Sequence, residues 1–221
     1  MKYSWRFVVV AGVFVTALVV SNIIAVKLVE VSGRIFPAGL VIFPLSYLLG
    51  DVLTEVYGIR SARRVIWLGF ACNLIALGAI QAAIHLPAAD FWQENQSAYE
   101  QVLGTTWRLF LASLAAYIVG ELANAYVLAF MKGATGGRWL WTRTIGSTIV
   151  GEGLDSAIFI TIAFAGAGAG ASLLNPIVTT WVIKVGWETL ATPFTYWVVG
   201  YLKRTEGVDV YDFGRPTLAR S

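Results

Sequence analysis

Long apolar stretches separated by short polar connections dominate this sequence. A helix that crosses a bilayer needs about 20 predominantly apolar residues. Six stretches of about that length cover residues 7–26, 37–57, 65–84, 108–131, 144–166 and 177–201. The first has no convincing cleavage site after it, so we interpret it as an uncleaved span. The pattern predicts an all-α polytopic membrane protein, with a six-helix transmembrane domain over residues 1–203 and a tail over 204–221.

The composition agrees with a membrane location. Charged residues make up 13% of the chain and hydrophobic residues 57%, against about 25% and about 45–50% in an ordinary soluble domain. This excludes a disordered tail protein, and the single cysteine, Cys72, cannot form a disulfide within the chain. With one histidine and one cysteine, the sequence shows no metal cluster and no Ser/His pair. We therefore expect no catalytic residues, no metal and no cofactor.

Basic residues predict the orientation of the spans. If the N-terminus lies inside, twelve of the 16 Lys and Arg residues fall in inner segments, whereas the outer segments hold Lys27, Arg34 and Arg108. Cytoplasmic loops carry an excess of Lys and Arg, so both termini, including the tail, are predicted to be cytoplasmic. The net charge of +3 then reflects topology and anionic lipid headgroups, and we expect no nucleic-acid partner.

The segment over residues 85–107 is the longest predicted outer connection. Its apolar residues recur at helical spacing with acidic residues between them. This pattern fits a short helix lying in the membrane interface, and it fits a plain exposed loop equally well. The sequence assigns the segment no role.

Several ionisable residues lie inside the predicted spans, where they are unusual. An Asp or Glu at the bilayer centre costs at least ~2.5–3.5 kcal/mol, so such a group usually faces a partner, water or a substrate. The ionisable residues inside the predicted spans are Asp51, Glu55, Glu121, Glu152, Asp155, Lys184 and Glu188. Spacings of three or four residues place neighbours on one helix face. Because Glu121, Asp155 and Glu188 fall near span centres, the pattern predicts a polar cavity at mid-membrane, the usual place for a transport substrate.

Two structural roles stay open for these charged residues. Lys184 and Glu188 are four residues apart and could form an intrahelical ion pair. Glu55 lies near the inner boundary, close in sequence to the arginines at positions 60, 63 and 64. We therefore favour a structural salt bridge for Glu55 over a contact with a ligand. Trp107, Trp181 and Trp187 are candidates for flat stacking surfaces beside the site, although most tryptophans of a membrane protein lie in the interfacial belt.

Four stretches carry a resemblance to a known family. They read SNIIAVK at 21–27, FPLSYLLGDVLTEVYG at 43–58, YIVGELAN at 117–124 and STIVGEGLDS at 147–156. Together and in this order they resemble the queuosine precursor transporter family, also called the vitamin uptake transporter family. The resemblance covers residues from about 7 to 203. One departure is Gly153, where a larger apolar residue is expected.

The resemblance implies a multi-pass protein of the bacterial cytoplasmic (inner) membrane. It would import 7-deazaguanine bases such as preQ0 and preQ1, which are salvaged to make queuosine in transfer RNA. The implied fold has six helices and is similar to that of the substrate-binding subunits of energy-coupling-factor transporters. Unlike those subunits, the protein would act without an ATPase. In agreement with transport without an ATPase, the sequence has no Walker-type phosphate-binding loop. The expected partners are a small purine-like base and the lipid bilayer; a homodimer stays open.

The chemistry of the candidate residues suits such a base. A carboxylate can accept from the N–H and NH₂ donors along the edge of a deazaguanine, as carboxylates do in base readout. We assign Glu121, Glu152 and Asp155 to this edge, Asn22 and Asn124 to polar orientation, and Asp51 to proton coupling or gating. The full candidate set is Asn22, Asp51, Glu121, Asn124, Glu152, Asp155, Lys184 and Glu188.

Two other functions stay open. The chain could be a substrate-binding subunit that captures a vitamin and requires a partner ATPase complex. It could also be an intramembrane enzyme, since paired acids in a bilayer occur in aspartyl proteases. Against the enzyme, the acids occur in LGD at 49–51 and GEGLD at 151–155 and not in the Gly-x-Gly-Asp pattern of such proteases.

Overall fold

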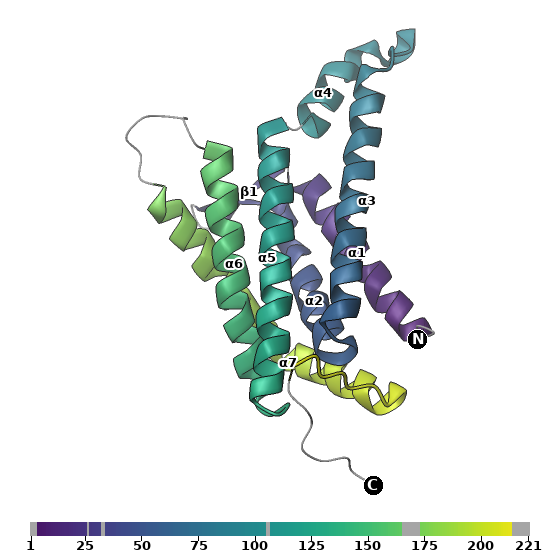
Figure 1. Cartoon of the computed structure of the whole chain (residues 1–221). Coiled ribbons are helices and arrows are strands. Elements are labelled where there is room, and N and C mark those ends of the chain that lie inside the picture. Colours follow the sequence, from purple (N-terminus) through teal and green to yellow (C-terminus); the bar gives the residue numbers. More distant parts are fainter. Residues whose placement is uncertain (1–3, 26, 32–33, 105–106, 165–172, 214–221) are drawn as a thin grey trace.

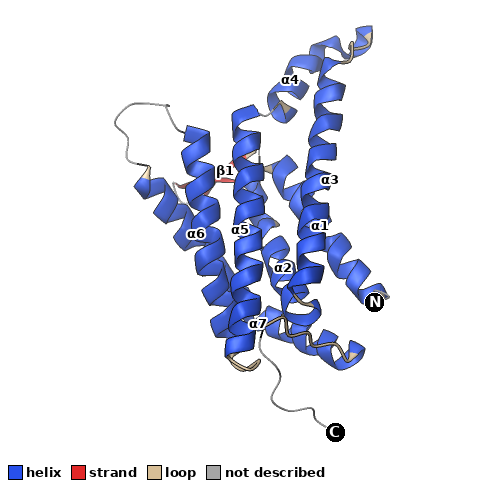
Figure 2. Ribbon diagram, viewed as in Figure 1, coloured by secondary structure: helices blue, strands red, loops and turns tan. Residues whose placement is uncertain are grey.

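The computed structural model describes residues 4–25, 27–31, 34–104, 107–164 and 173–213, which form a bundle of helices (Figure 1). The helices are α1 (Trp5–Ile24), α2 (Phe43–Tyr57), α3 (Ile59–His85), α4 (Gln93–Leu103), α5 (Trp107–Ala134), α6 (Leu140–Phe164) and α7 (Leu174–Glu206). Short 3-10 turns cover Ala38–Val41 and Asp90–Trp92. One antiparallel hairpin, β1 (Leu28–Val31) with β2 (Arg34–Pro37), joins α1 to α2 (Figure 2). The predicted helical class is confirmed; the hairpin was not expected.

Four helices of the described chain are long and apolar enough to cross a membrane: α1, α3, Leu111–Ala134 of α5 and Leu140–Ala163 of α6. These four helices correspond to four of the six predicted spans. The stretch 37–57 is not one helix, because α2 has only 15 residues, about 22 Å of helix, and a strand end and a 3-10 turn precede it. In α7, Lys184 and Glu188 lower the hydropathy of a 33-residue helix.

Helix α2 forms the centre of the bundle. All residues from Ser46 to Tyr57 are buried, since α1, α3, α5 and α7 surround the helix. Pro44 lies in its first turn, where the missing N–H costs no hydrogen bond. The helix ends at Gly58, whose φ of 82° favours glycine, and α3 begins at the next residue. The acidic residues Asp51 and Glu55 are thereby held in the interior.

Two glycines bring α5 and α6 into close contact. A Cβ placed on Gly151 would lie 2.6 Å from the Asn124 Cβ and 2.9 Å from the Gly120 carbonyl oxygen. A Cβ on Gly120 would lie 2.9 Å from both the Gly151 carbonyl oxygen and the Asp155 Cβ. Small residues allow membrane helices to approach in this way. The contact matters for function because Glu121, Asn124, Glu152 and Asp155 all flank it.

The first and last described residues lie at the same end of the bundle (Figure 1). The Ser4 hydroxyl donates to Glu206 Oε1 at 2.6 Å, which ties the start of α1 to the end of α7. We call this the terminal end and the opposite one the distal end. The first and last described residues thus lie on the same side, which agrees with the predicted topology, whereas the assignment of that side to the cytoplasm stays a prediction.

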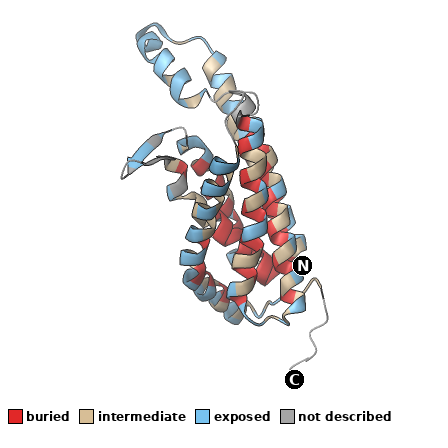
Figure 3. Cartoon of the chain, turned by 90° about the vertical axis from the view of Figure 1, so that its left-hand side faces the viewer, coloured by how far each residue is buried: buried red, intermediate tan, exposed pale blue. Residues whose placement is uncertain are grey.

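Many large apolar residues are exposed on the outside of the bundle, and Figure 3 shows exposed positions along the outer faces of the helices. Ile75 is 71% exposed, Leu190 75% and Trp197 67%. Such a surface matches lipid and would be unusual for a protein in water. Helix α4 projects at the distal end with no buried residue. Helix α4 confirms the helical alternative for residues 93–103 of the predicted outer segment 85–107, and its position in the interface stays a prediction.

Candidate functional site

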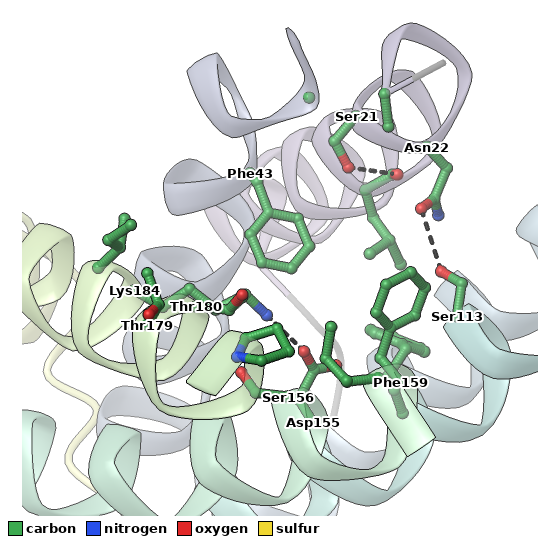
Figure 4. Close-up of a pocket in the computed structure, with 18 of the residues that line it drawn as sticks. Ser21, Asn22, Phe43, Ser113, Asp155, Ser156, Phe159, Thr179, Thr180 and Lys184 are labelled. Carbon is green, nitrogen blue, oxygen red and sulfur yellow. Dashed lines mark hydrogen bonds and ion pairs between the residues drawn. The ribbon is translucent and has the colours of Figure 1, made fainter. Parts of the chain in front are cut away.

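A cavity of about 610 Å³ lies in the distal half of the bundle (Figure 4). It is enclosed by the last turns of α1, the 3-10 turn before α2, the first residue of α2, and parts of α5, α6 and α7. Its volume falls within the ~300–1,000 Å³ range of small-molecule sites. Most of the wall is apolar, and the charged residues that line it are Asp155 and Lys184. The cavity thus has the size and the lining of a ligand site.

The charged residues lie close to the middle of their helices. Glu152 is the central residue of α6, Glu121 is central in α5, and Glu188 lies two residues from the centre of the longer α7. Asp155 is one turn from Glu152 toward the distal end. The carboxylates therefore lie within about one turn of their helix centres, although the apolar stretch had put Asp155, and not Glu152, at the centre of α6.

Lys184 is the centre of the site. Its ammonium group forms ion pairs with Glu152 Oε2, at 2.8 Å, and with Asp155 Oδ2, both from α6. The Lys184 nitrogen also lies 4.7 Å from the ring centroid of Phe43 and 5.8 Å from that of Tyr47, within the range of cation–π interactions. One lysine thereby joins α7 to α6 and α2 at the cavity wall.

The ion pairs of Lys184 correct one sequence-based alternative. An intrahelical pair with Glu188 was open, but both ion-pair partners of Lys184 in the described chain belong to α6. The reason is tertiary packing: α6 presents two carboxylates one turn apart to Lys184, and two acids attract the ammonium more strongly than one. Glu188 is left buried, 3% exposed.

A second buried pair lies deeper. The Asn124 side-chain amide donates to Asp51 Oδ1 at 2.7 Å, which connects α5 to α2. Within the described residues, Asp51 Oδ2, Glu121 Oε2 and Glu188 Oε1 have no hydrogen-bond partner. None of these three residues lines the cavity. Unpartnered buried oxygens are rare in proteins, so they call for an explanation beyond packing.

The eight candidate residues thus divide into two groups. Asn22, Asp155 and Lys184 line the cavity. The others lie below its floor or beside it, where they are nearly inaccessible: Asp51, Glu121, Asn124, Glu152 and Glu188. Asn22 lies near the end of α1, where its amide donates to Asn73 Oδ1 at 2.7 Å. The sequence placed these residues on inward faces, but it could not separate the two groups.

The aromatic walls differ from the expected ones. Trp181 donates its indole N–H to the Ile149 carbonyl oxygen at 2.9 Å, and Trp187 is 49% exposed on the outside. The side chain of Trp107 lies outside the described residues. The rings that line the cavity are instead those of Phe43, Tyr117 and Phe159. Two of them carried a spacing signal: Tyr117 lies four residues before Glu121, and Phe159 lies four residues after Asp155.

The departure from the family pattern at Gly153 has a structural counterpart. A Cβ at Gly153 would lie 3.5 Å from the indole nitrogen of Trp181, which is ordinary van der Waals contact. The large ring of Trp181 on α7 packs where a larger residue at position 153 would be. The space is filled from the neighbouring helix.

A separate charged cluster closes the terminal end. Glu55 accepts from Arg143 in two places, Nη2 to Oε1 at 2.8 Å and Nε to Oε2 at 3.2 Å. Lys203 reaches Glu55 Oε1 at 2.6 Å, and Lys132 lies 3.8 Å from the same oxygen. A structural bridge at Glu55 was expected, but its partners come from α5, α6 and α7 rather than from the arginines at the start of α3.

The segment after α7 packs onto this cluster. Asp209 Oδ1 forms ion pairs with Lys132 at 2.5 Å and Lys203 at 2.9 Å, and Asp212 accepts from the Ile59 backbone N–H at 2.7 Å. Burial alone would raise the pKa of Asp209, but the hydrogen bonds from Lys132 and Lys203 hold the pKa below its usual value. The tail is therefore docked against the bundle as far as the structure describes it.

A multi-pass helical membrane protein with a cavity in the distal half of the bundle, lined by a lysine–carboxylate pair, has the architecture of a small-molecule transporter. The comparisons with known proteins agree. The family described as “Putative vitamin uptake transporter” matches residues 37–198, which is most of the chain. The chain belongs to this family.

Two curated relatives are similar over much of their length. One from Bacillus subtilis (strain 168), named “Probable queuosine precursor transporter”, is 32% identical over 181 residues, which is 81% of this chain and 79% of the relative. A protein of the same name from Haemophilus influenzae is 26% identical over 129 residues, 57% of this chain and 51% of the relative. No solved structure matches the chain. The likeness to energy-coupling-factor subunits therefore stays a prediction.

Proposed function

We propose that this protein imports queuosine precursors, 7-deazaguanine bases such as preQ0 and preQ1, across the bacterial inner membrane through the distal cavity. The family membership and the names of both relatives support this substrate class. The observation that carries the proposal is the Asp155 carboxylate, which lines a largely apolar cavity between aromatic rings.

The geometry suits a flat base with hydrogen-bond donors along one edge. Asp155 can accept from ring N–H and exocyclic NH₂ groups, and Lys184 fixes the orientation of its carboxylate. Phe43, Tyr117 and Phe159 provide ring surfaces for stacking against the base. Asn22 offers polar contacts at the part of the cavity wall formed by α1.

The depth of the other acids refines their roles. Glu152 does not line the cavity, and its ion pair with Lys184 gives it a positioning role. Glu121, assigned from the sequence to the donor edge of the base, lies below the cavity floor. We therefore propose Asp155 as the carboxylate that contacts the base directly.

The test is binding and transport by the purified chain. We expect preQ0 or preQ1 to raise the unfolding temperature in detergent, whereas common vitamins do not, because a ligand that binds the folded state stabilises it by about 2.7 kcal/mol at 100 times its Kd. Uptake of labelled preQ1 into liposomes containing this chain alone would also exclude a strict requirement for a partner ATPase.

The variant Asp155→Asn removes the carboxylate with little change in volume. We expect it to lose most preQ1 uptake at normal expression, and Asp90→Asn, the same change at an exposed position, to retain uptake. Unchanged binding and uptake by Asp155→Asn would refute the role of Asp155. A panel in which a vitamin stabilises the protein and no deazaguanine does would refute the proposed substrate.

A further inference from the structure

The middle of the bundle holds more buried acids than buried cations. Five carboxylates approach one another there: Asp51, Glu121, Glu152, Asp155 and Glu188. Among the described residues, Lys184 is the one cation that forms an ion pair with any of them, and it pairs with Glu152 and Asp155. Asp51, Glu121 and Glu188 have no ion-pair partner in the described chain. If all five were ionised, several negative charges would be uncompensated in the interior.

Such a state is energetically prohibitive. The penalty for burying one ion is several kcal/mol even after relaxation, and neighbouring like charges add to it. Glu121 faces Glu152 and Asp155 of α6 together with Glu188 and Lys184 of α7, and Tyr117 of its own helix lies one turn away. Some of these carboxyls therefore hold protons when the base site is empty.

The unpartnered oxygens point to the residues that hold them. Asp51 Oδ2, Glu121 Oε2 and Glu188 Oε1 are buried without a hydrogen-bond partner, and they come from α2, α5 and α7. Asp51 is surrounded by Glu188 of α7, Asn124 and Glu121 of α5 and, one turn along its own helix, Glu55. A proton on any of these carboxyls neutralises it and supplies a donor for a neighbouring oxygen.

The acids also form a connected series along the bundle. Asp155 and Lys184 line the cavity, and Glu188 follows Lys184 by four residues, about 6 Å along the helix. Asp51 faces Glu188, and Glu55, a further turn along α2, lies in the charged cluster at the terminal end. Titratable groups thus extend from the cavity wall to the opposite end of the bundle.

We propose that Asp51, Glu121 and Glu188 form a proton-binding site that couples entry of the base to entry of a proton. This inference rests on the proposed function. While Glu188 holds a proton, Lys184 stays paired with Asp155 and fixes the carboxylate that accepts from the base. Loss of that proton makes Glu188 an ionised alternative partner four residues from Lys184, and a lysine drawn away from Asp155 weakens the base site. Because such linkage is reciprocal, the base and the proton bind together and are released together.

The experiment uses the full chain in liposomes and preQ0 as the probe. preQ0 carries a nitrile in place of the aminomethyl group of preQ1, so it brings no titrating amine into the assay. Counterflow exchange of labelled preQ0, without any gradient, first measures transport alone. A pH step of one unit, acid outside, is then imposed while valinomycin and potassium hold the membrane potential at zero.

For one proton per base, we expect preQ0 to accumulate up to about tenfold, because one pH unit is equivalent to about 1.4 kcal/mol per proton, a factor of ten in a ratio. Addition of external preQ0 should also acidify the lumen, as followed with a trapped pH indicator. These readouts do not depend on the orientation of the protein in the liposome and need no variant.

Variants locate the coupling group. We expect Glu188→Gln to retain counterflow and to lose accumulation, with an internal ratio near one, while Glu94→Gln on the exposed α4 behaves as wild type. Wild-type counterflow without accumulation and without acidification would overturn the proton coupling and leave the proposed function intact. Absence of both preQ0 binding and counterflow would remove the proposed function, and this inference with it.

Discussion

Replacement of Gly151 by alanine is the sharpest test of how the site is positioned. The new Cβ would lie 2.6 Å from the Asn124 Cβ, 2.9 Å from the Gly120 carbonyl oxygen and 3.2 Å from the Asn124 Cα. Carbon atoms pack at about 3.5–4.0 Å. The obstructing atoms are backbone or Cβ atoms, which cannot rotate away, so α5 and α6 must separate locally by roughly 1 Å.

The expected magnitude follows from two opposing effects. Insertion of a methyl group into a well-packed contact costs about 1–3 kcal/mol, and alanine regains about 0.5–1 kcal/mol over glycine in a helix. The central values of these two ranges leave a net loss of about 1 kcal/mol. For a chain of this length this lowers the unfolding temperature by roughly 2–4 °C. Because Asn124 and Asp155 are displaced with the helices, preQ1 binding should weaken as well.

A matched control lies two residues away on the same helix. A Cβ at Gly153 meets Trp181 Nε1 at 3.5 Å, an ordinary contact, so Gly153→Ala should be neutral or stabilising by up to about 1 kcal/mol. The assay is thermal unfolding of both purified variants in one detergent, followed by titration with preQ1. If Gly151→Ala is as stable as wild type, or if Gly153→Ala loses as much stability as Gly151→Ala, the glycine contact does not set the distance between α5 and α6.

Three further predictions concern the terminal end. A green fluorescent protein fused after the tail should fluoresce and an alkaline phosphatase fused there should be inactive, because the tail is predicted to be cytoplasmic; the reverse would overturn the orientation. Glu55→Gln leaves Arg143 without its buried counter-ion and should cost about 3–5 kcal/mol of stability, measured by thermal unfolding against Glu94→Gln. Asp209 has a lowered pKa, so its contribution to stability is present at neutral pH and is lost as the pH falls through that lowered value. Asp209→Asn should cost under about 1 kcal/mol of stability because the group is partly exposed. The variant should also lose this part of the pH dependence of stability, and an unchanged acid profile would contradict the role of Asp209.

The sequence by itself determined the class of the protein and the location of its main helices. Apolar stretches long enough for a bilayer predicted α1, α3, α5 and α6 to within a few residues, because hydropathy and length are properties of the local chain. The same arithmetic placed Glu121 close to the centre of its helix, whereas Asp155, which it put at the centre of its stretch, lies three residues from the centre of α6, where Glu152 lies. Helical spacing also predicted correctly that these acids face inward, since an ionisable group in lipid is too costly to leave outside.

Where the apolar pattern was ambiguous, the prediction of structure was incomplete. The stretch 37–57 contains a strand end, a 3-10 turn and the short helix α2, yet apolar residues predominate along its whole length. A continuous apolar run does not distinguish these conformations. The central position of α2, with other helices on all sides, removes the polar face that would have marked its bounds.

The partners of the charged residues were decided only by the tertiary structure. Spacing along one helix suggested Glu188 for Lys184, whereas the packing of α7 on α6 brings two carboxylates to the ammonium group instead. Glu55 bonds to Arg143 and Lys203, which are 88 and 148 residues away in the chain. Periodicity records the face on which a residue lies, but the identity of its neighbour depends on how closely helices approach, which contacts such as Gly120 against Gly151 determine.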